Sequence, residues 1–280
     1  MVLVVKIGGS AGVATTQIAR DIAQCIAEGQ RVVVMHGASD LTNTLCARLN
    51  RPVCMITSPN GMTSRYTDAE TLSIFAMAVG QINTELVALL QQHGVNALGL
   101  SGLDGRLLMA RRKTAIRSVL PDGRTQIIRD DFTGQVEAVN APLLQQLLDS
   151  GYIPVIAPLA LGHEGERLNV DGDRAAALIA ATLQANTLAI MTNVPGLLEN
   201  PADQQTLIRS IPADQLATYL PYAQGRMRKK MLGAQEALDG GVRRVCIGSG
   251  SLLDVVQGVG TTIETISIAV GASHGGRIDA

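Results

Sequence analysis

The chain has 280 residues and a formal net charge of −1 at pH 7, which excludes a protein that binds nucleic acid through overall charge. No apolar run reaches about 18 residues, so no segment is predicted to span a membrane. Hydrophobic residues make up 46% of the chain but aromatic residues only 2%, so the core is predicted to be aliphatic. That composition favours a parallel sheet covered by helices over a β-sandwich.

Strand and helix patterns alternate along the chain. Apolar runs predict strands at 2–7, 31–35, 97–100, 153–157, 187–191 and 244–247. Amphipathic stretches predict helices at 16–28, 69–92, 141–149, 173–184 and 225–238. This rhythm of strand and helix predicts an open, mostly parallel α/β sheet.

One region interrupts the alternation. Short strands predicted at 106–110, 114–120 and 125–129 are joined by turn-forming residues, which indicates a β-hairpin region that stands off the main sheet. A stretch without periodicity at 161–165 predicts a boundary between two parts, 1–165 and 166–280. From residue 264 the sequence fits either an added strand or a frayed end.

Lys6 is the most informative residue. The apolar run 2–5 predicts a buried strand, yet it leads into Val5-Lys6-Ile7-Gly8-Gly9-Ser10. Burying an unpaired ammonium group is costly, and glycines let a backbone approach a ligand closely. A cation beside a glycine turn at a strand end suits a phosphate group.

Small residues recur at other strand ends. Glycine or other small residues follow the carboxyl ends of five predicted strands. In open α/β sheets, ligands bind at this edge. The five segments are Gly8-Gly9, Gly37-Ala38-Ser39, Ser101-Gly102, Thr192-Asn193-Val194-Pro195-Gly196 and Gly248-Ser249-Gly250. A plain turn explains any one of them, but the set favours a phosphate site built from backbone N–H groups.

Three further features have a functional and a structural interpretation. His36 is either a catalytic base or, as we favour, a histidine that bonds to backbone at a strand end. Asp171-Gly172-Asp173 is either a helix N-cap or places Asp173 near phosphates. The cations of Gly225-Arg226-Met227-Arg228-Lys229-Lys230 oppose the helix dipole, which favours a bound anion over a solvated face.

Taken in order, these motifs resemble the amino acid kinase family. The matching segments include Ser64-Arg65-Tyr66-Thr67-Asp68, Asn169-x-Asp171-x-Asp173 and Met227-x-x-Lys230, and the resemblance spans roughly residues 1 to 263. The outline is similar to N-acetylglutamate kinases. Longer segments, such as 99–106 and 223–227, are more similar to the LysW-aminoadipate kinases, a branch that acts on an amino-group carrier protein.

The resemblance implies a three-layer αβα sandwich, with an acceptor-binding and dimerising lobe at 1–165 and an ATP-binding lobe at 166–280. It implies that Lys6 and Lys230 stabilise the transferring phosphoryl group and that Asp173 holds both lysines. Arg65, Asn169 and Gly37-Ala38-Ser39 would bind the acceptor. The nucleotide and its phosphates would contact Gly8, Gly9, Ser10, Thr192, Asn193, Gly196 and Met227.

Two departures from N-acetylglutamate kinases stand out. Gly37-Ala38-Ser39 replaces three glycines, and Ala38 tolerates fewer backbone conformations than glycine. Asn193 replaces a common aspartate, which changes a charge near the expected nucleotide. The first of these departures weakens the plain N-acetylglutamate interpretation.

The expected chemistry fits the motifs. A carboxylate acceptor is ionised at pH 7, so its phosphorylation needs no general base. The cosubstrate is expected to be ATP with Mg²⁺ held mainly by ATP oxygens, and no metal cage of protein residues is predicted.

The hairpin region suggests a macromolecular partner. Seven of the chain's 23 Lys and Arg residues lie between Ser101 and Asp130. This is either an ordinary solvated hairpin or a docking face for a small acidic carrier protein, formed by Arg106, Arg111, Arg112, Lys113 and Arg117. The resemblance places the carried amino acid on the C-terminal glutamate of that carrier.

The sequence leaves several alternatives open. The leading hypothesis is an ATP-dependent kinase of carrier-linked 2-aminoadipate in lysine biosynthesis. The carried amino acid is not distinguished from glutamate, because one methylene is worth only about 1–3 kcal/mol in a pocket. The runner-up is an N-acetylglutamate kinase of arginine biosynthesis, and another class is a non-catalytic nucleotide sensor.

Four widely spaced cysteines predict reduced thiols and a cytoplasmic location. A homodimer is expected.

Overall fold

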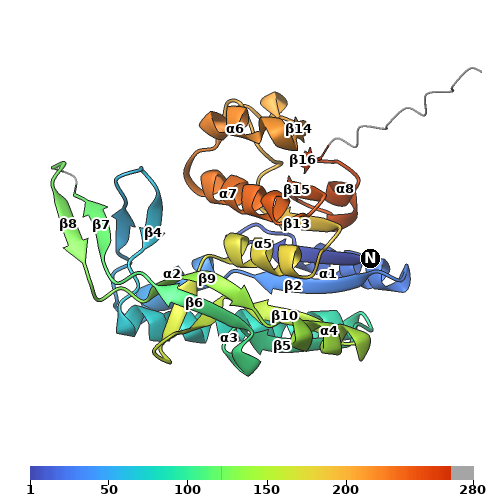
Figure 1. Cartoon of the computed structure of the whole chain (residues 1–280), viewed down its shortest axis with the longest axis horizontal. Helices are drawn as coiled ribbons and strands as arrows, with labels where there is room; N and C mark the ends of the chain where they lie inside the picture. The colour runs from blue at the N-terminus through green and yellow to red at the C-terminus, as the bar shows by residue number, and fades with distance from the viewer. Residues whose placement is uncertain (121, 266–280) are drawn as a thin grey trace, which may run out of the picture.

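A central sheet organises the molecule. The computed structural model describes residues 1–120 and 122–265. Eight strands form one sheet in the order β14-β16-β15-β13-β1-β2-β10-β5 (Figure 1). The six strands from β15 to β5 run parallel, and β16 pairs antiparallel with β15. The strand bounds are β1 Val2–Ile7, β2 Arg31–His36, β5 Ala97–Ser101, β10 Ile153–Ala157, β13 Thr187–Met191, β14 Ser210–Pro212, β15 Arg244–Gly248 and β16 Thr261–Glu264.

Both faces of the sheet are buried, which explains why the central strands read as continuous apolar runs. In β1, Leu3 and Val5 pack on one face, and Val4 packs on the other. Helices α1, α3 and α8 cover the first face, and α4, α5 and α7 cover the second. The predicted three-layer α/β fold is therefore confirmed. The helices are α1 Thr15–Ala27, α2 Ser39–Arg48, α3 Ala69–Gln92, α4 Ala141–Asp149, α5 Gly172–Thr182, α6 Leu216–Tyr219, α7 Gly225–Asp239 and α8 Leu252–Val256.

A small closed barrel adjoins this sandwich. It contains β11-β12-β9-β6, with bounds β6 Leu108–Arg112, β9 Thr133–Val139, β11 Leu159–Gly162 and β12 Arg167–Val170. The strand predicted at 106–110 was therefore misplaced. A 3-10 turn at Asp104–Arg106 precedes β6, and β6 pairs with β9 and β11 rather than with the hairpin. Residue 165, the predicted boundary, lies in the turn between β11 and β12.

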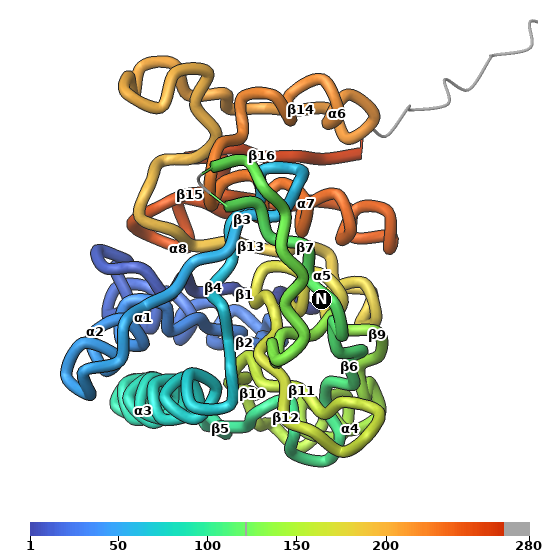
Figure 2. The backbone as a smooth tube through the Cα atoms, turned by 90° about the vertical axis from the view of Figure 1, so that its left-hand side faces the viewer, coloured from blue at the N-terminus to red at the C-terminus, as the bar shows by residue number. Residues whose placement is uncertain are grey.

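Two hairpins extend on the same side of the molecule (Figures 1 and 2). One is the predicted excursion: β7 Ile116–Val119 pairs only with β8 Thr125–Ile128 among the described strands. The other, β3 Met55–Thr57 with β4 Thr63–Arg65, was not predicted. β3 and β7 are in contact, so the two hairpins lie side by side. The prediction for residues 264–280 lies outside the described residues from 266 onward.

By length and composition alone, α3 is apolar enough to cross a membrane. Here it lies along the sheet, with Leu86 and Leu90 in the core. Leu72, Phe75 and Val79 belong to a second cluster with Ala38, Ala157 and Leu159. The outward face of α3 is exposed and carries Met77 at its centre.

Candidate active site

The site begins at the turns that follow β1 and β2. Gly9 lies directly against the backbone of the neighbouring turn: a Cβ at Gly9 would lie 2.3 Å from the Ala38 nitrogen. The Ser39 hydroxyl donates to the Gly9 carbonyl at 2.9 Å, and the Asp40 N–H donates to it at 2.8 Å. Only glycine fits this contact, so Gly9 locks the two strand-end turns together beside Lys6.

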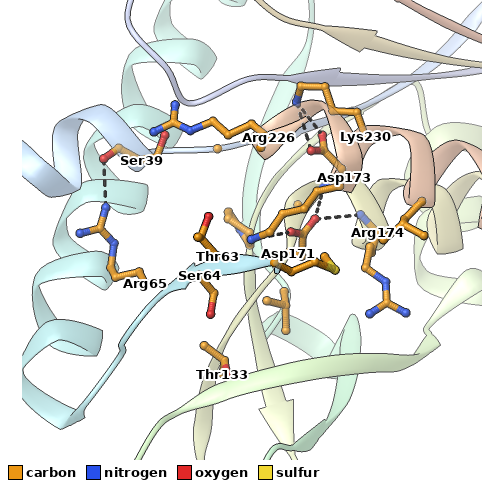
Figure 3. Close-up of a pocket in the computed structure, with 18 of the residues that line it drawn as sticks. Ser39, Thr63, Ser64, Arg65, Thr133, Asp171, Asp173, Arg174, Arg226 and Lys230 are labelled. Atoms are coloured by element: carbon orange, nitrogen blue, oxygen red, sulfur yellow. Dashed lines mark hydrogen bonds and ion pairs between the residues drawn. The ribbon is translucent and has the colours of Figure 1, made fainter. Parts of the chain in front are cut away.

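Lys6, Asp173 and Lys230 form one buried cluster. Lys6 lies at the carboxyl end of β1, Asp173 in the first turn of α5, and Lys230 in α7. The Lys6 Nζ lies 2.8 Å from Asp173 Oδ1, and the Lys230 Nζ lies 3.1 Å from Asp173 Oδ2. Each of the three residues is at most 7% exposed. One carboxylate thus holds two ammonium groups at the floor of a cleft, as shown for Asp173 and Lys230 in Figure 3.

The charges in this cluster depend on one another. Burial by itself would raise the pKa of Asp173, but the Lys6 and Lys230 ammonium groups outweigh burial and hold that pKa well below its usual range. Burial lowers the pKa of Lys230, Lys6 lowers it further, and Asp173 opposes both effects. The cluster carries a net positive charge that an incoming phosphoryl group would neutralise.

Local structure fixes the position of Asp173. Asp171 caps α5, and its carboxylate accepts from the backbone N–H groups of Asp173 and Arg174 at 3.0 and 3.2 Å. On α7, Gly233 lies against the Asp173 backbone, and a Cβ at Gly233 would lie 3.1 Å from the Asp173 carbonyl oxygen. This close helix contact brings Lys230, one turn earlier on α7, to the Asp173 carboxylate.

The cations that open α7 all have partners. Arg226 donates to the Ser10 hydroxyl at 2.6 Å, and Arg228 donates to the Asn60 carbonyl at 3.1 Å. Lys229 lies 3.7 Å from Asp171. The helix that carries Lys230 is therefore tied to the glycine turn after β1 and to the β3–β4 hairpin.

The expected acceptor residues line the opposite wall. Arg65, at the end of β4, donates to the Ser39 carbonyl at 3.3 Å (Figure 3). It also donates to the Asn43 side chain. Its Nη1 is buried without a hydrogen-bond partner among the described residues. Burial lowers the pKa of Arg65. Asn169, at the end of β12, donates to the Thr67 hydroxyl at 3.1 Å. A desolvated guanidinium with an unused donor is suited to bind an anionic group.

Residues expected at the nucleotide extend the cleft toward β13 and α7. The Asn193 side chain donates to the Ala11 carbonyl at 3.1 Å, which fixes the loop after β1. The structure brings every residue proposed for the site to one cavity of about 2010 Å³: Lys6, Gly8, Gly9, Ser10, Gly37, Ala38, Ser39, Arg65, Asn169, Asp173, Thr192, Asn193, Gly196, Met227 and Lys230. Their individual roles stay predictions.

The cavity is strongly basic. Ten Lys and Arg residues line it, against the three carboxylates of Asp171, Asp173 and Glu236. In the described part of the chain, no three His, Cys, Asp or Glu residues are grouped as a metal cage. The surplus of cations fits a polyanionic ligand.

The structure favours the structural interpretation of His36. It is fully buried outside this cavity, with Nε2 at 3.1 Å from the Asn83 amide nitrogen and Nδ1 at 3.4 Å from the Gly37 carbonyl. Burial lowers the pKa of His36 to about 4, and Lys6 contributes in the same direction. His36 is neutral at pH 7 and supports the turn after β2.

The basic hairpin region divides in two. Arg111, Arg112, Lys113 and Arg117 line the cavity. Arg106 does not, because it lies in the 3-10 turn before β6, next to α4. Four of the five residues predicted to form the docking face therefore line the cavity, and the docking role of all five stays a prediction.

The amino acid kinase family model matches residues 1–249. The chain belongs to the amino acid kinase family. Among the family's members, the [LysW]-aminoadipate kinase of Deinococcus radiodurans is 48% identical over 247 residues, 88% of this chain and 84% of the relative. The [LysW]-aminoadipate kinase of Thermus thermophilus is 44% identical over 269 residues, 94% of this chain and all of the relative.

Solved structures agree with this assignment to the amino acid kinase family. An N-acetylglutamate synthase from Neisseria gonorrhoeae superposes with a TM-score of 0.76 at 26% identity, covering 95% of this chain and 60% of that one. A carbamate kinase from Giardia gives 0.67 at 14% identity, covering 95% and 99%, and shows the shared fold alone.

Sequence reasoning missed several residues that hold the cavity-lining elements in place. Asn83 holds His36 from α3, and Asn43 holds Arg65 from α2. Arg174 and Gly233 join α5 to α7, where Arg174 pairs with Glu236. No spacing signal marks these residues, because each meets a partner that is distant along the chain.

Proposed function

We propose that this protein is an ATP-dependent kinase that phosphorylates the side-chain carboxylate of 2-aminoadipate carried on a LysW-type protein. The Lys6–Asp173–Lys230 cluster carries the chemical part of the proposal. The names of the relatives at 44–48% identity support the substrate, and they do not favour N-acetylglutamate or a non-catalytic sensor. Relatives named as acting on both LysW-aminoadipate and LysW-glutamate share 34% identity or more, so glutamate remains a second carried amino acid to test.

The proposed reaction follows from the charges at the site. A carboxylate oxygen of the acceptor attacks the γ-phosphorus of ATP, the bond to the β,γ-bridging oxygen breaks, and ADP leaves with the electron pair. Both reactants are anions, so the main task is to neutralise charge and to position the groups. Lys6 and Lys230 would contact the transferring phosphoryl group, and Asp173 would hold both ammonium groups in place. Bound Mg²⁺ would neutralise the charge of the ATP phosphates.

The two halves of the chain would divide the substrates. Gly8, Gly9 and Ser10 would hold the phosphates, and Thr192, Asn193, Gly196 and Met227 would contact ATP from the 166–280 lobe. In the 1–165 lobe, Arg65, with its unused Nη1, would bind the acceptor's free carboxylate. Asn169 and the Gly37-Ala38-Ser39 turn would contact its amide and chain.

The carrier would dock on the hairpin side. Arg111, Arg112, Lys113 and Arg117 line the cavity, and of these Arg111, Lys113 and Arg117 are exposed. A positive surface of this kind steers an acidic partner and orients it. Arg106 is outside this surface and would contribute only long-range attraction.

We further propose a homodimer in the cytoplasm. The exposed face of α3 carries Ser73, Met77, Gly80, Thr84 and Ala88, none of them charged. The neighbouring strand β5 pairs with β10 on one side and is the edge strand of the sheet as described. Such a face suits close packing against a second copy. All four cysteines are free, which agrees with a reducing compartment.

A hydroxamate assay tests the function. Purified enzyme with ATP, Mg²⁺ and hydroxylamine is given N-acetylglutamate, N-acetyl-aminoadipate, or LysW carrying glutamate or aminoadipate. The proposal expects kcat/KM to be highest for LysW-aminoadipate. Highest kcat/KM with free N-acetylglutamate would assign the protein to arginine biosynthesis, and ATP binding without transfer to any acceptor would indicate a sensor.

A further inference from the structure

Asn83 joins α3 to the ends of three parallel strands. Its amide nitrogen donates to the Val155 carbonyl of β10 at 2.8 Å and to the Leu100 carbonyl of β5 at 3.4 Å. The same nitrogen lies 3.1 Å from Nε2 of His36, the last residue of β2. Gly99 makes room for this side chain, because a Cβ there would lie 2.2 Å from the Asn83 Oδ1 atom. A side-chain amide is therefore fixed in one orientation beside the end of β2.

The Val155 carbonyl decides the tautomer of His36. A carbonyl oxygen can only accept, so the atom of Asn83 that faces it is the amide nitrogen. Because that nitrogen also faces His36 Nε2, Nε2 accepts and the imidazole proton is assigned to Nδ1. Burial lowers the pKa of His36 to about 4, so the neutral imidazole is the form present at pH 7.

The Nδ1 proton faces the turn that follows β2. Nδ1 lies 3.4 Å from the Gly37 carbonyl oxygen and donates to it. The peptide bond between Gly37 and Ala38 is trans, so the Ala38 N–H points away from the Gly37 carbonyl. Gly37 and Ala38 line both the large cavity and a smaller one of about 400 Å³ behind the turn, whereas His36 lines only the smaller one. Holding the carbonyl on the His36 side therefore directs the Ala38 N–H toward the large cavity.

The Ala38 N–H is left without an acceptor among the described residues, although Ala38 is only 3% exposed. The neighbouring groups of the turn are bonded: the Ala38 carbonyl accepts from Thr42, and the Asp40 N–H donates to Gly9. A buried backbone donor without a partner costs free energy unless a ligand supplies the acceptor. The φ of Ala38 is negative, at −144°, so the turn does not require glycine at this position.

We propose that Asn83 is a positioning residue for the acceptor: through the tautomer of His36, it holds the Gly37–Ala38 peptide with its N–H toward the acceptor. The inference rests on the proposed function and deepens it, since the turn would contact the amide and chain of the acceptor. Asn83 and His36 lie outside the large cavity and would touch no substrate. Their effect should therefore appear in the KM for the acceptor more than in kcat.

Nitrogen NMR tests the tautomer without any substrate. The chain has four histidines, and the His36 signals are identified by their loss in His36→Gln. In ¹⁵N-labelled wild type at pH 7, they should show a protonated Nδ1 and an unprotonated Nε2. Asn83→Leu, which removes the donor, should lose this fixed tautomer. A proton on Nε2 in wild type would overturn the proposal, whatever the substrates of the enzyme are.

Kinetics with Asn83→Asp tests the positioning role. A carboxylate accepts and cannot donate, so it should draw the imidazole proton to Nε2 and leave Nδ1 bare against the Gly37 carbonyl. The KM for LysW-aminoadipate should rise roughly threefold to tenfold at pH 8, with kcat changed much less. Toward pH 5.5 the new carboxylate should favour the imidazolium against burial and the charge of Lys6. The imidazolium again has a proton on Nδ1, so the KM should return toward the wild-type value.

Gln91→Leu is the matched control. Gln91 is another α3 amide, which donates to the Ala97 carbonyl of β5 at 3.1 Å and has no hydrogen bond to His36 among the described residues. Its loss should leave the KM for the acceptor unchanged, and circular dichroism checks that each variant is folded.

The outcomes separate the two proposals. An Asn83→Asp protein with a normal KM at pH 8, or with a KM raised equally at pH 8 and pH 5.5, would overturn the positioning role and leave the proposed function intact. If wild type phosphorylates neither the carrier-linked nor the free acceptor, the proposed function fails and the positioning role fails with it.

Discussion

Asp173→Asn should destabilise the protein strongly, because it leaves two buried ammonium groups without a counter-ion. At separations of 2.8 and 3.1 Å, each ion contact is worth about 5–6 kcal/mol at an effective dielectric of about 20, before desolvation is subtracted. Removing one partner of a buried ion pair costs roughly 3–5 kcal/mol in measured cases. We expect that loss in the free energy of unfolding, and a fall in kcat of ~10² or more.

Asp171→Asn is the matched control on the same helix. Asparagine caps helices as well as aspartate does, and the Asp171–Lys229 pair is longer, at 3.7 Å, and partly exposed. Its cost should stay below about 1 kcal/mol. Urea unfolding followed by circular dichroism is the appropriate assay, because the chain has no Trp.

The pH dependence of the free energy of unfolding is a second check on the role of Asp173. The pKa of Asp173 is depressed in the folded state, so its stabilising effect is present above the ordinary value of 3.8 and is lost as the pH falls further. The stability difference between wild type and Asp173→Asn should be constant from pH 8 to about 4 and shrink below it. Equal stability of the two proteins at pH 7 would refute the reasoning.

Three more outcomes are expected. The pKa of His36 is about 4 in the folded protein and 6.5 in the unfolded chain, so the free energy of unfolding of wild type should fall by roughly 3 kcal/mol between pH 6.5 and 4. His36→Gln should lack that loss. Urea unfolding midpoints measured across this pH range check both expectations. Gly233→Val should separate α5 from α7 at Asp173 and lower kcat at least tenfold. Hydroxamate formation measures kcat, and circular dichroism is the folding control. An unchanged kcat would show that this contact does not position Lys230. Lys6→Ala and Lys230→Ala should each lower kcat by ~10² or more with the fold retained, and near-normal turnover in either would remove that lysine from the mechanism.

The main sheet was predictable because its signal is local. Central parallel strands are buried on both faces, so 2–7 and 187–191 read as apolar runs whatever their neighbours are. Helices α1, α4, α5 and α7 were located within two residues, because each has one face against the core. Helix α2 was missed: only Thr42 and Cys46 are buried in it, which leaves almost no apolar periodicity.

The short strands were harder to predict from the sequence. β3 and β4 have three residues each, and β4 is Thr63-Ser64-Arg65, which has no apolar residue. β11 and β12 are joined through Gly162 and Gly165, and the same residues suggested a boundary between lobes. Their pairing in a closed barrel is a tertiary contact that no local pattern encodes.

The candidate site residues came from a different signal and, for Lys230, from the family resemblance. A charge at the end of an apolar run and a carboxylate at a helix start are visible in sequence, and the structure places Lys6, Asp173 and Lys230 in one cluster. Partners that serve only to hold others, such as Asn83 and Gly233, have no chemical signature of their own. Their roles become visible only when distant segments are seen together.

Trapping the product tests the central claim most directly. LysW carrying aminoadipate is incubated with ATP, Mg²⁺ and hydroxylamine, and its terminal peptide is analysed by mass spectrometry. We predict an ATP-dependent hydroxamate on the aminoadipate side-chain carboxylate, formed at least ~10² more slowly by Lys6→Ala. Absence of the hydroxamate with wild type, or equal rates for wild type and Lys6→Ala, would contradict the account.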